Sequence, residues 1–353
     1  RDPEMSRGLG DVYKRQGLLY LILALIIKLA GVKRVMRFLP PVVTGPIIIC
    51  IGLSLAPSAV SNASTNWLIA LVALAVIIIF NIWGKGMFKI IPILLGVVIS
   101  YAFAFLLNSF GVTNPDGSAI LDFTNVASAS IVGLPPFRIC KFDLTAILVM
   151  APIAIATMME HIGDIAAISA TTGKNYIRDP GLNKTLLGDG LATAMAGLLG
   201  GPANTTYGEN TGVLALTKIY DPLVIRIAAV FAMILSFCPK FEAVINTIPS
   251  GIVGGISFVL YGMISAIGVR NVVENKVDFT NSRNLIIAAV ILVCALGFNS
   301  VGGITFAVFG VDINLSGLAI AAIAGILLNA ILPGNDYEFD EGSNEPESAS
   351  LRV

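Results

Sequence analysis

A short polar stretch between two long apolar segments contains residue types that could bind a small polar molecule. Its residues are Asn204-Thr205-Thr206-Tyr207-Gly208-Glu209-Asn210-Thr211-Gly212. The stretch offers a carboxylate, two amides and three threonine hydroxyls among segments that are almost entirely hydrocarbon. Unpaired polar groups are costly in lipid, so such a stretch must be buried in protein or line a cavity. A polar, glycine-broken entry to a short helix is one way in which membrane transporters form a midplane binding site.

Glu209 is predicted to start a short helix over residues 208–219. A helix N-terminus presents free N–H groups and the positive end of the helix dipole. These N–H groups could pair with polar atoms of a flat, neutral ligand, while Glu209 accepts the ligand's ring N–H groups and Tyr207 supplies an aromatic face. The alternative is that Glu209 only caps the helix and closes a structural hydrogen-bond network. Residues 204–206 are predicted to be extended, because two of them are β-branched.

A second pair of acids, Glu160 and Asp164, lies inside the apolar run 144–172. Their spacing of four residues places both carboxylates on one face of a helix. An ionisable group at membrane depth is expensive and therefore indicates a function. The alternative is that the helix ends early and leaves both acids at the membrane interface. His161 is expected to point away from this acidic face and to have a structural role.

Two further acids are weaker candidates. Asp189 lies in another apolar run, within Leu187-Gly188-Asp189-Gly190. A carboxylate there would suit coupling or gating, and it would suit a packing or interface role equally well. Asp179-Pro180-Gly181 is predicted to be a loop turn without a functional role.

The composition is that of an all-α polytopic membrane protein. Of 353 residues, 56% are hydrophobic and 12% are charged, with a mean hydropathy of +0.87. Soluble domains carry about 25% charged residues. The net charge of zero suggests no nucleic-acid partner, and the scattered cysteines and single histidine argue against a metal site. We expect no metal, no cofactor and no catalytic residue.

Apolar segments of roughly membrane-spanning length are expected to form helices along the chain. They cover residues 17–31, 40–57, 67–83, 89–108, 144–172, 185–200, 208–219, 222–238, 243–266, 284–298 and 314–332. Lys and Arg concentrate in every second connection, and the positive-inside rule then places the acidic C-terminal tail in the cytoplasm. The loop 109–143 contains a strong turn signal, Asn114-Pro115-Asp116-Gly117.

A weak internal repeat links distant parts of the chain. Leu39-Pro40, followed by Gly45, opens one apolar run, and Ile248-Pro249, followed by Gly254, opens another. Such repeats are typical of transporter folds built by duplication. The alternative is that proline is common at helix starts in any protein.

Three stretches together resemble the uracil/xanthine permease family of nucleobase–cation symporters, and within it the bacterial uracil permeases. They are Arg178-Asp179-Pro180-Gly181-Leu182, residues 204–213, and Glu274-x-Lys276-Val277-Asp278. The resemblance runs from about residue 17 to residue 332. Its most specific part is the sequence from Asn204 to Asn210.

The resemblance implies fourteen membrane segments in two inverted seven-segment repeats, with a core domain that moves against a gate domain. On that plan the chain starts at the fourth segment, and a short strand precedes the half-helix near residues 204–208. The implied order is a non-native leader (1–16), a core remnant (17–31), the first half of the gate (32–108), an extracytoplasmic loop (109–143), the core with the substrate site (144–240), the second half of the gate (241–332) and a disordered cytoplasmic tail (333–353).

Site roles are also implied by the resemblance. Glu160 matches the core-helix glutamate that holds the nucleobase, and Glu209 matches the second glutamate, which binds the ring and is linked to protonation. Tyr207 and Gly208 match positions whose backbone contacts the base. Asp164 stands where the uracil-permease pattern has histidine, which is closer to xanthine-type members, and it is a third candidate for proton coupling. Secondary candidates are Asn204, Thr205, Thr206, Asn210 and Asp189.

The resemblance therefore implies a secondary active transporter and not an enzyme. It would import uracil with H+ by alternating access in the bacterial plasma membrane, surrounded by lipid, as a homodimer formed through the gate domain. A xanthine or other purine symporter of the same family is the first alternative. An anion carrier of the same architecture is the second, and it would need a basic residue at the site, for which Arg226 is the only candidate inside an apolar run.

Overall fold

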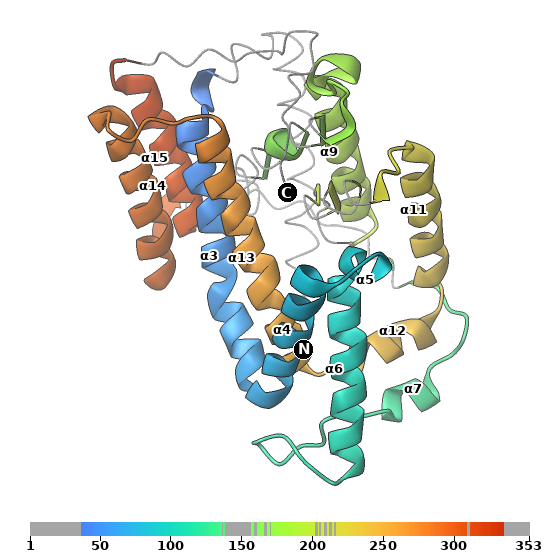
Figure 1. The fold of residues 1–353 in the computed structure, drawn as a ribbon. Helices are drawn as coiled ribbons and strands as arrows, with labels where there is room; N and C mark the ends of the chain where they lie inside the picture. Colours follow the sequence, from blue (N-terminus) through green and yellow to red (C-terminus); the bar gives the residue numbers. More distant parts are fainter. Residues whose placement is uncertain are drawn as a thin grey trace. The chain divides into compact units, whose positions relative to one another are not determined.

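The computed structural model of the chain is mainly helical (Figure 1). It describes residues 37–135, 137, 157–158, 161–165, 168–169, 171–201, 204, 206–207, 210–211, 214, 217–308 and 311–334. Its helices are α3 (Pro41–Ser64), α4 (Trp67–Trp83), α5 (Met87–Ile90), α6 (Pro92–Ser109), α7 (Thr124–Ser128), α9 (Leu182–Leu198), α11 (Pro222–Ser236), α12 (Pro239–Asn246), α13 (Ser250–Glu274), α14 (Ser282–Ser300) and α15 (Gly317–Ile331). A π-helical turn, η1 (Ile177–Gly181), precedes α9, and strands β1 (Ile304–Val308) and β2 (Val311–Leu315) form an antiparallel hairpin.

Several helices are apolar and long enough to cross a membrane. Within the described residues these are α3, α6, α13 and α14, and the pair α11 and α12 would add a fifth span if counted together, although it is bent by 92°. Helices α4 and α15 are apolar but shorter. Because roughly 20 apolar residues are needed to span a bilayer, these lengths agree with a polytopic membrane protein.

Polar side chains mark the first turn of four helices. The side-chain oxygen of the N-cap residue accepts a hydrogen bond from a backbone N–H two or three residues on in α4, α11, α14 and α15. The capping residues are Asn66, Asp221, Asn281 and Ser316. Each cap satisfies one of the N–H groups that a helix start leaves without an intrahelical partner.

Contacts between residues divide the chain into two compact units. The first comprises residues 1–51, 138–215 and 266–353, and the second comprises residues 52–137 and 216–265. The long helices α3 and α13 are each divided between the two units, α3 after Ile51 and α13 after Ser265.

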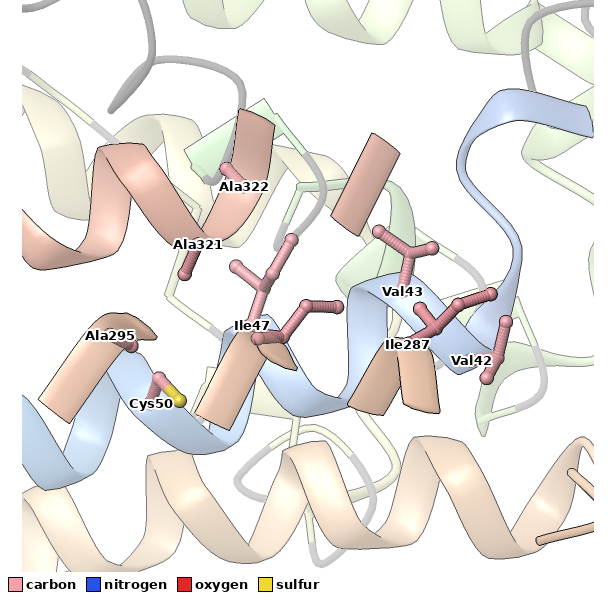
Figure 2. Packing of buried hydrophobic residues seen from close by; sticks show 9 residues of the cluster. Val42, Val43, Ile47, Cys50, Ile287, Ala295, Ala321 and Ala322 are labelled. Carbon is pink, nitrogen blue, oxygen red and sulfur yellow. The ribbon is translucent and has the colours of Figure 1, made fainter. Parts of the chain in front are cut away.

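The core of the first unit lies between α3, α14 and α15. Helices α14 and α15 lie side by side (Figure 1), and aliphatic and small residues of all three helices interlock (Figure 2). Its buried members are Val42, Val43, Ile47, Cys50, Ile287, Ile291, Ala295, Ala321 and Ala322. The nearby side chain of Asn329, which is 1% exposed, donates to the carbonyl of Arg37 at 3.1 Å and accepts from the guanidinium of Arg283 at 2.8 Å.

The core of the second unit lies between α4, α6 and the first half of α13. Its buried members are Ile69, Ala73, Ile77, Ala104, Ile120, Leu121, Ile252 and Ile256. The hydroxyls of Tyr101 and Thr247 are hydrogen-bonded at 2.6 Å beside this cluster. The predicted turn at Asn114 is confirmed, because the N–H of Gly117, at a φ of +81°, donates to the carbonyl of Asn114 at 2.9 Å.

Three of the expected helix boundaries are wrong. The run 40–57 continues to Ser64 in α3, past Pro57, because Ala59 and Ala63 are buried and tertiary packing outweighs the local cost of proline. The run 89–108 is interrupted at Ile91, and α6 starts at Pro92, a residue that suits a first helical turn.

The third error is the run 243–266. It joins the end of α12 to α13, whereas the structure ends α12 at Asn246 and starts α13 after Pro249, which disfavours helix at the preceding residue. Helix α13 instead extends through a polar end to Glu274. There the side chain of Asn271 donates to the Thr44 hydroxyl of α3 at 3.1 Å. The hairpin β1–β2 lies mainly in the connection between the expected helices 284–298 and 314–332.

The connection between α13 and α14 contains the last of the motifs singled out in the sequence. Both the hydroxyl and the N–H of Thr280 donate to the exposed carboxylate of Asp278, which lowers the pKa of that carboxyl. Arg270 and Glu274 form an exposed ion pair on the last turn of α13. Residues 274–278 thus form the end of α13 and the start of the connection to α14.

Glycine allows close packing of α13 against α3 in the second unit, and this predicts a matched pair of variants. A methyl group at buried Gly254 would overlap the backbone of Ala63, whereas one at Gly262, on the same helix, would meet nothing within 4 Å. Overpacking costs typically about 1–3 kcal/mol, and replacing an unhindered helical glycine by alanine gains up to about 1 kcal/mol. We expect Gly254→Ala to lower the thermal unfolding midpoint in detergent and Gly262→Ala to leave it unchanged or raise it. Equal shifts would contradict this packing.

Candidate binding site

Helix α9 presents a row of polar side chains at intervals of four residues. Thr185, Asp189 and Thr193 follow one another along one side of the helix, because 3.6 residues make a turn. The apolar residues Leu182 and Leu186 are fully buried. This face of α9 therefore combines apolar packing with three polar groups that need partners.

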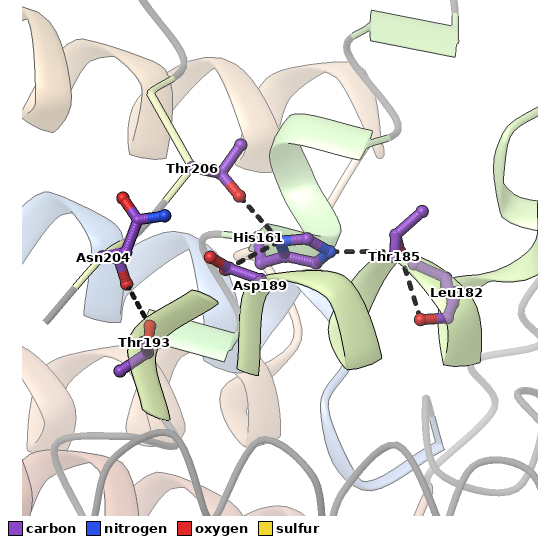
Figure 3. A network of polar contacts seen from close by, with 7 residues as sticks. All are labelled: His161, Leu182, Thr185, Asp189, Thr193, Asn204 and Thr206. Atoms are coloured by element: carbon purple, nitrogen blue, oxygen red, sulfur yellow. Dashed lines mark hydrogen bonds and ion pairs between the residues drawn. The ribbon is translucent and has the colours of Figure 1, made fainter. Parts of the chain in front are cut away.

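The imidazole of His161 is the partner of two of these groups (Figure 3). Its Nε2 atom lies 3.1 Å from the Thr185 hydroxyl, and its Nδ1 atom lies 3.2 Å from the Asp189 carboxylate. Nδ1 also lies 2.6 Å from the hydroxyl of Thr206, in the segment before the short helix. The side chains of His161 and Asp189 are only 4% and 8% exposed. One ring thus joins three separate parts of the chain.

Apolar contacts hold the helical turn 161–165 against the start of α9. Ile162 and Leu182 are buried together, and Ile165 and Ile177 pack against them. The hydroxyl of Ser169 accepts a hydrogen bond from the N–H of Tyr176 at 3.0 Å, at the start of the turn that leads into α9. These contacts determine how far the imidazole reaches toward α9.

The segment before the short helix has a second attachment to α9. The hydroxyl of buried Thr193 donates to the carbonyl of Asn204 at 2.8 Å (Figure 3). Thr193 lies one turn beyond Asp189 on the same side of α9. Helix α9 therefore holds Asn204 directly through Thr193, while Thr206 is linked to α9 through the ring of His161.

The predicted site residues are only partly described by the structure. Glu160, Thr205, Gly208 and Glu209 lie outside the described residues. The structure brings Asp189 and Thr206 together at His161 and attaches Asn204 to Thr193. Asp164 is 6% exposed, Tyr207 is 62% exposed, and Asn210 is helical and exposed.

His161 and Asp164 are both buried. The expectation that His161 points away from the face of Glu160 and Asp164 stays a prediction, because Glu160 lies outside the described residues. The described residues of the predicted strand, Asn204, Thr206 and Tyr207, have no strand assignment, and the strand itself stays a prediction because its other members lie outside the described part.

His161 is the residue that the sequence reasoning undervalued. A usable signal was present, because the only histidine of an apolar chain needs polar partners and α9 offers Thr185 and Asp189 one turn apart. No group of three or more His, Cys, Asp or Glu side chains suited to a metal ion occurs within the residues that the structure describes.

Comparison with known proteins identifies the family. The model of a family described as the permease family matches residues 15–304. The chain belongs to this permease family. A uracil permease of Bacillus caldolyticus is 40% identical over 94% of this chain and 76% of its own length. Uracil permeases of Bacillus subtilis and Escherichia coli K12 are 40% and 35% identical, over 90% and 89% of this chain and 74% and 72% of their own lengths.

Membership confirms the resemblance found in the sequence. Members of the permease family are transporters, and the apolar helices of this permease agree with a multi-pass membrane protein. The polar row on α9 is therefore a feature of a transport protein, in a setting where buried polar groups must be paired within the protein.

The bond between Thr193 and Asn204 predicts a stability change in this permease. Thr193→Val keeps the shape of the side chain but removes the donor, leaving the Asn204 carbonyl without it. The bond is partly buried, and a typical intramolecular hydrogen bond contributes about 0.5–1.5 kcal/mol. We expect Thr193→Val to lower the thermal unfolding midpoint and Thr193→Ser, which keeps the hydroxyl, to restore most of the loss. A Thr193→Ser variant as unstable as Thr193→Val would show that the hydroxyl is not responsible.

Proposed function

We propose that this permease is a secondary active transporter that imports uracil together with a proton by alternating access. The observation that carries the proposal is the similarity, at about 40% identity over nine-tenths of the chain, to proteins named uracil permeases. The polar stretch from Asn204 to Gly212 supports it, because it offers the donors and acceptors that a small, flat, polar base needs. Transport requires no cofactor in this proposal.

Two glutamates bind the base and carry the proton in the proposed mechanism. A carboxylic acid at membrane depth favours its neutral form and can then donate to a uracil carbonyl. Glu160 holds the base from the core helix, and Glu209 binds its ring and exchanges the proton. Deprotonation on the cytoplasmic side weakens binding and releases the base. Tyr207 and Gly208 contact the base through their backbone, Asp164 assists proton coupling, and Asn204, Thr205, Thr206, Asn210 and Asp189 line or support the site.

The proposed scaffold consists of inverted repeats with a core domain moving against a gate domain. Reciprocal contacts between α3 and α13 support the repeat. In the first unit a methyl group at Gly45 would overlap Val272, and in the second unit one at Gly254 would overlap Ala63. Gly45 and Gly254 each lie five residues after the proline that precedes the helix, and Ala63 and Val272 each lie 23 residues after it. Equal spacing in both directions is what a two-fold relation between duplicated segments produces.

The proposed setting is the plasma membrane of a bacterium, with the C-terminus in the cytoplasm. The alternation of basic connections supports this orientation. The proposed domain order follows the family plan, with the core over residues 144–240 and the gate over residues 32–108 and 241–332, and a homodimer forms through the gate.

A purine such as xanthine is the second candidate substrate. Asp164 favours it, because the uracil-permease pattern has histidine at that position. An anion carrier is less well supported, because the polar stretch contains no basic residue and Arg226 lies exposed on α11.

Uptake in cells tests the proposed function. Cells that produce the full-length protein are expected to accumulate labelled uracil more strongly as the external pH falls, because the proton is a co-substrate. Glu209→Gln removes the proton-carrying group and is expected to lower uptake at least about tenfold, which corresponds to about 1.4 kcal/mol. Exposed Glu242→Gln on α12 is the matched control. Undiminished accumulation by Glu209→Gln would contradict the mechanism, and stronger competition by unlabelled xanthine than by uracil would identify the purine as substrate.

A further inference from the structure

The hydrogen bonds around His161 determine where the protons of its ring lie. The Thr185 hydroxyl is 3.1 Å from Nε2 and also donates to the carbonyl of Leu182 at 3.1 Å. A hydroxyl has one hydrogen to donate, and a carbonyl can only accept. When Thr185 donates its hydrogen to Leu182, its oxygen can only accept from the ring, and the contact with Nε2 then requires a proton on that nitrogen.

The other ring nitrogen faces two oxygen atoms. Nδ1 lies 2.6 Å from the Thr206 hydroxyl and 3.2 Å from Oδ2 of Asp189. If Nδ1 were bare, Thr206 could donate to it, but the lone pair of the ring would face the carboxylate. Oδ2 is buried and makes no hydrogen bond of regular geometry in the described part of the chain. A buried carboxylate without a counter-charge is expensive, and a proton on both ring nitrogens gives Asp189 a counter-charge at ion-pair distance.

We propose that His161 is a positioning residue that acts as an imidazolium paired with the Asp189 carboxylate. The pair is neutral overall, which suits an apolar surrounding better than a lone charge.

The position of His161 in the chain indicates what its ion pair with Asp189 would do. The ring directly follows Glu160, is bound to α9 through Thr185 and Asp189, and reaches Thr206, three residues before Glu209. It thus ties the segments that contain the two proposed binding acids to one helix. The part played in transport rests on the proposed function, whereas the protonation state of the ring does not.

The single histidine of the chain makes the ring directly observable. Full-length protein would be labelled with ¹⁵N-histidine and purified through a tag without histidine. Its nitrogen NMR spectrum would show the ring nitrogens of His161 and of any histidine outside the present sequence. The His161 signals would be those lost in His161→Gln. At neutral pH we expect both nitrogens of His161 to carry a proton. In Asp189→Asn the counter-charge is gone, and we expect Nδ1 to become bare while Nε2 stays protonated. A bare Nδ1 in the unmodified protein, or an unchanged spectrum in Asp189→Asn, would overturn the proposal.

A second measurement tests positioning apart from folding. Thr206→Val leaves the ion pair intact but cuts the bond to the segment before Glu209, so the KM for uracil should rise about tenfold with a smaller change in the maximal rate. Thr206→Ser should restore the KM. An unchanged KM in Thr206→Val would overturn the positioning role. If the unmodified protein takes up no uracil, the proposed function fails, while the ring spectrum still decides the protonation state.

Discussion

Every polar group buried in this permease must find its partner inside the protein, because the hydrocarbon around its apolar helices offers none. Among the described residues, several such contacts gather in two places. His161 serves Thr185, Asp189 and Thr206, and Asn329 joins Arg283 to the chain before α3. These polar contacts therefore also connect segments that are distant in the sequence. Because the chain contains few polar residues, each of these contacts helps to position several elements.

Between these points, small residues bring the helices together. Burial of apolar surface gives little driving force between helices that are surrounded by lipid, so close contact and dispersion have to supply it. In the first unit Gly45 allows α3 to approach Val272, and in the second unit Gly254 allows α13 to approach Ala63. Between α3, α14 and α15, alanine side chains pack among isoleucine and valine side chains.

The helices were largely predictable because their signal is continuous hydrophobicity, and α4 and α9 lie close to the expected runs. Boundaries failed where tertiary contacts outweigh a proline, as at Pro57, or where a proline divides one apolar run, as at Pro249. The acids of the candidate site were visible in the sequence, since charge is conspicuous among hydrocarbon residues. The partners of His161 were not predicted, because they depend on which residues of α9 face the ring, and that is decided by the packing of Ile162 against Leu182. Whether Glu160 and Glu209 meet stays a prediction.

The capped starts of α4, α11, α14 and α15 have a consequence for the lipid around them. A side-chain cap stabilises one residue as the start of a helix, so the N-terminal end of each of these helices is set by the sequence. In a thicker or thinner membrane these ends resist a shift by one turn, because the cap would be lost at a cost of about 1 kcal/mol. The helices then tilt, or deform the lipid next to them, at a modest cost for each ångström of mismatch. Membrane thickness would thus act on the inclination of these helices.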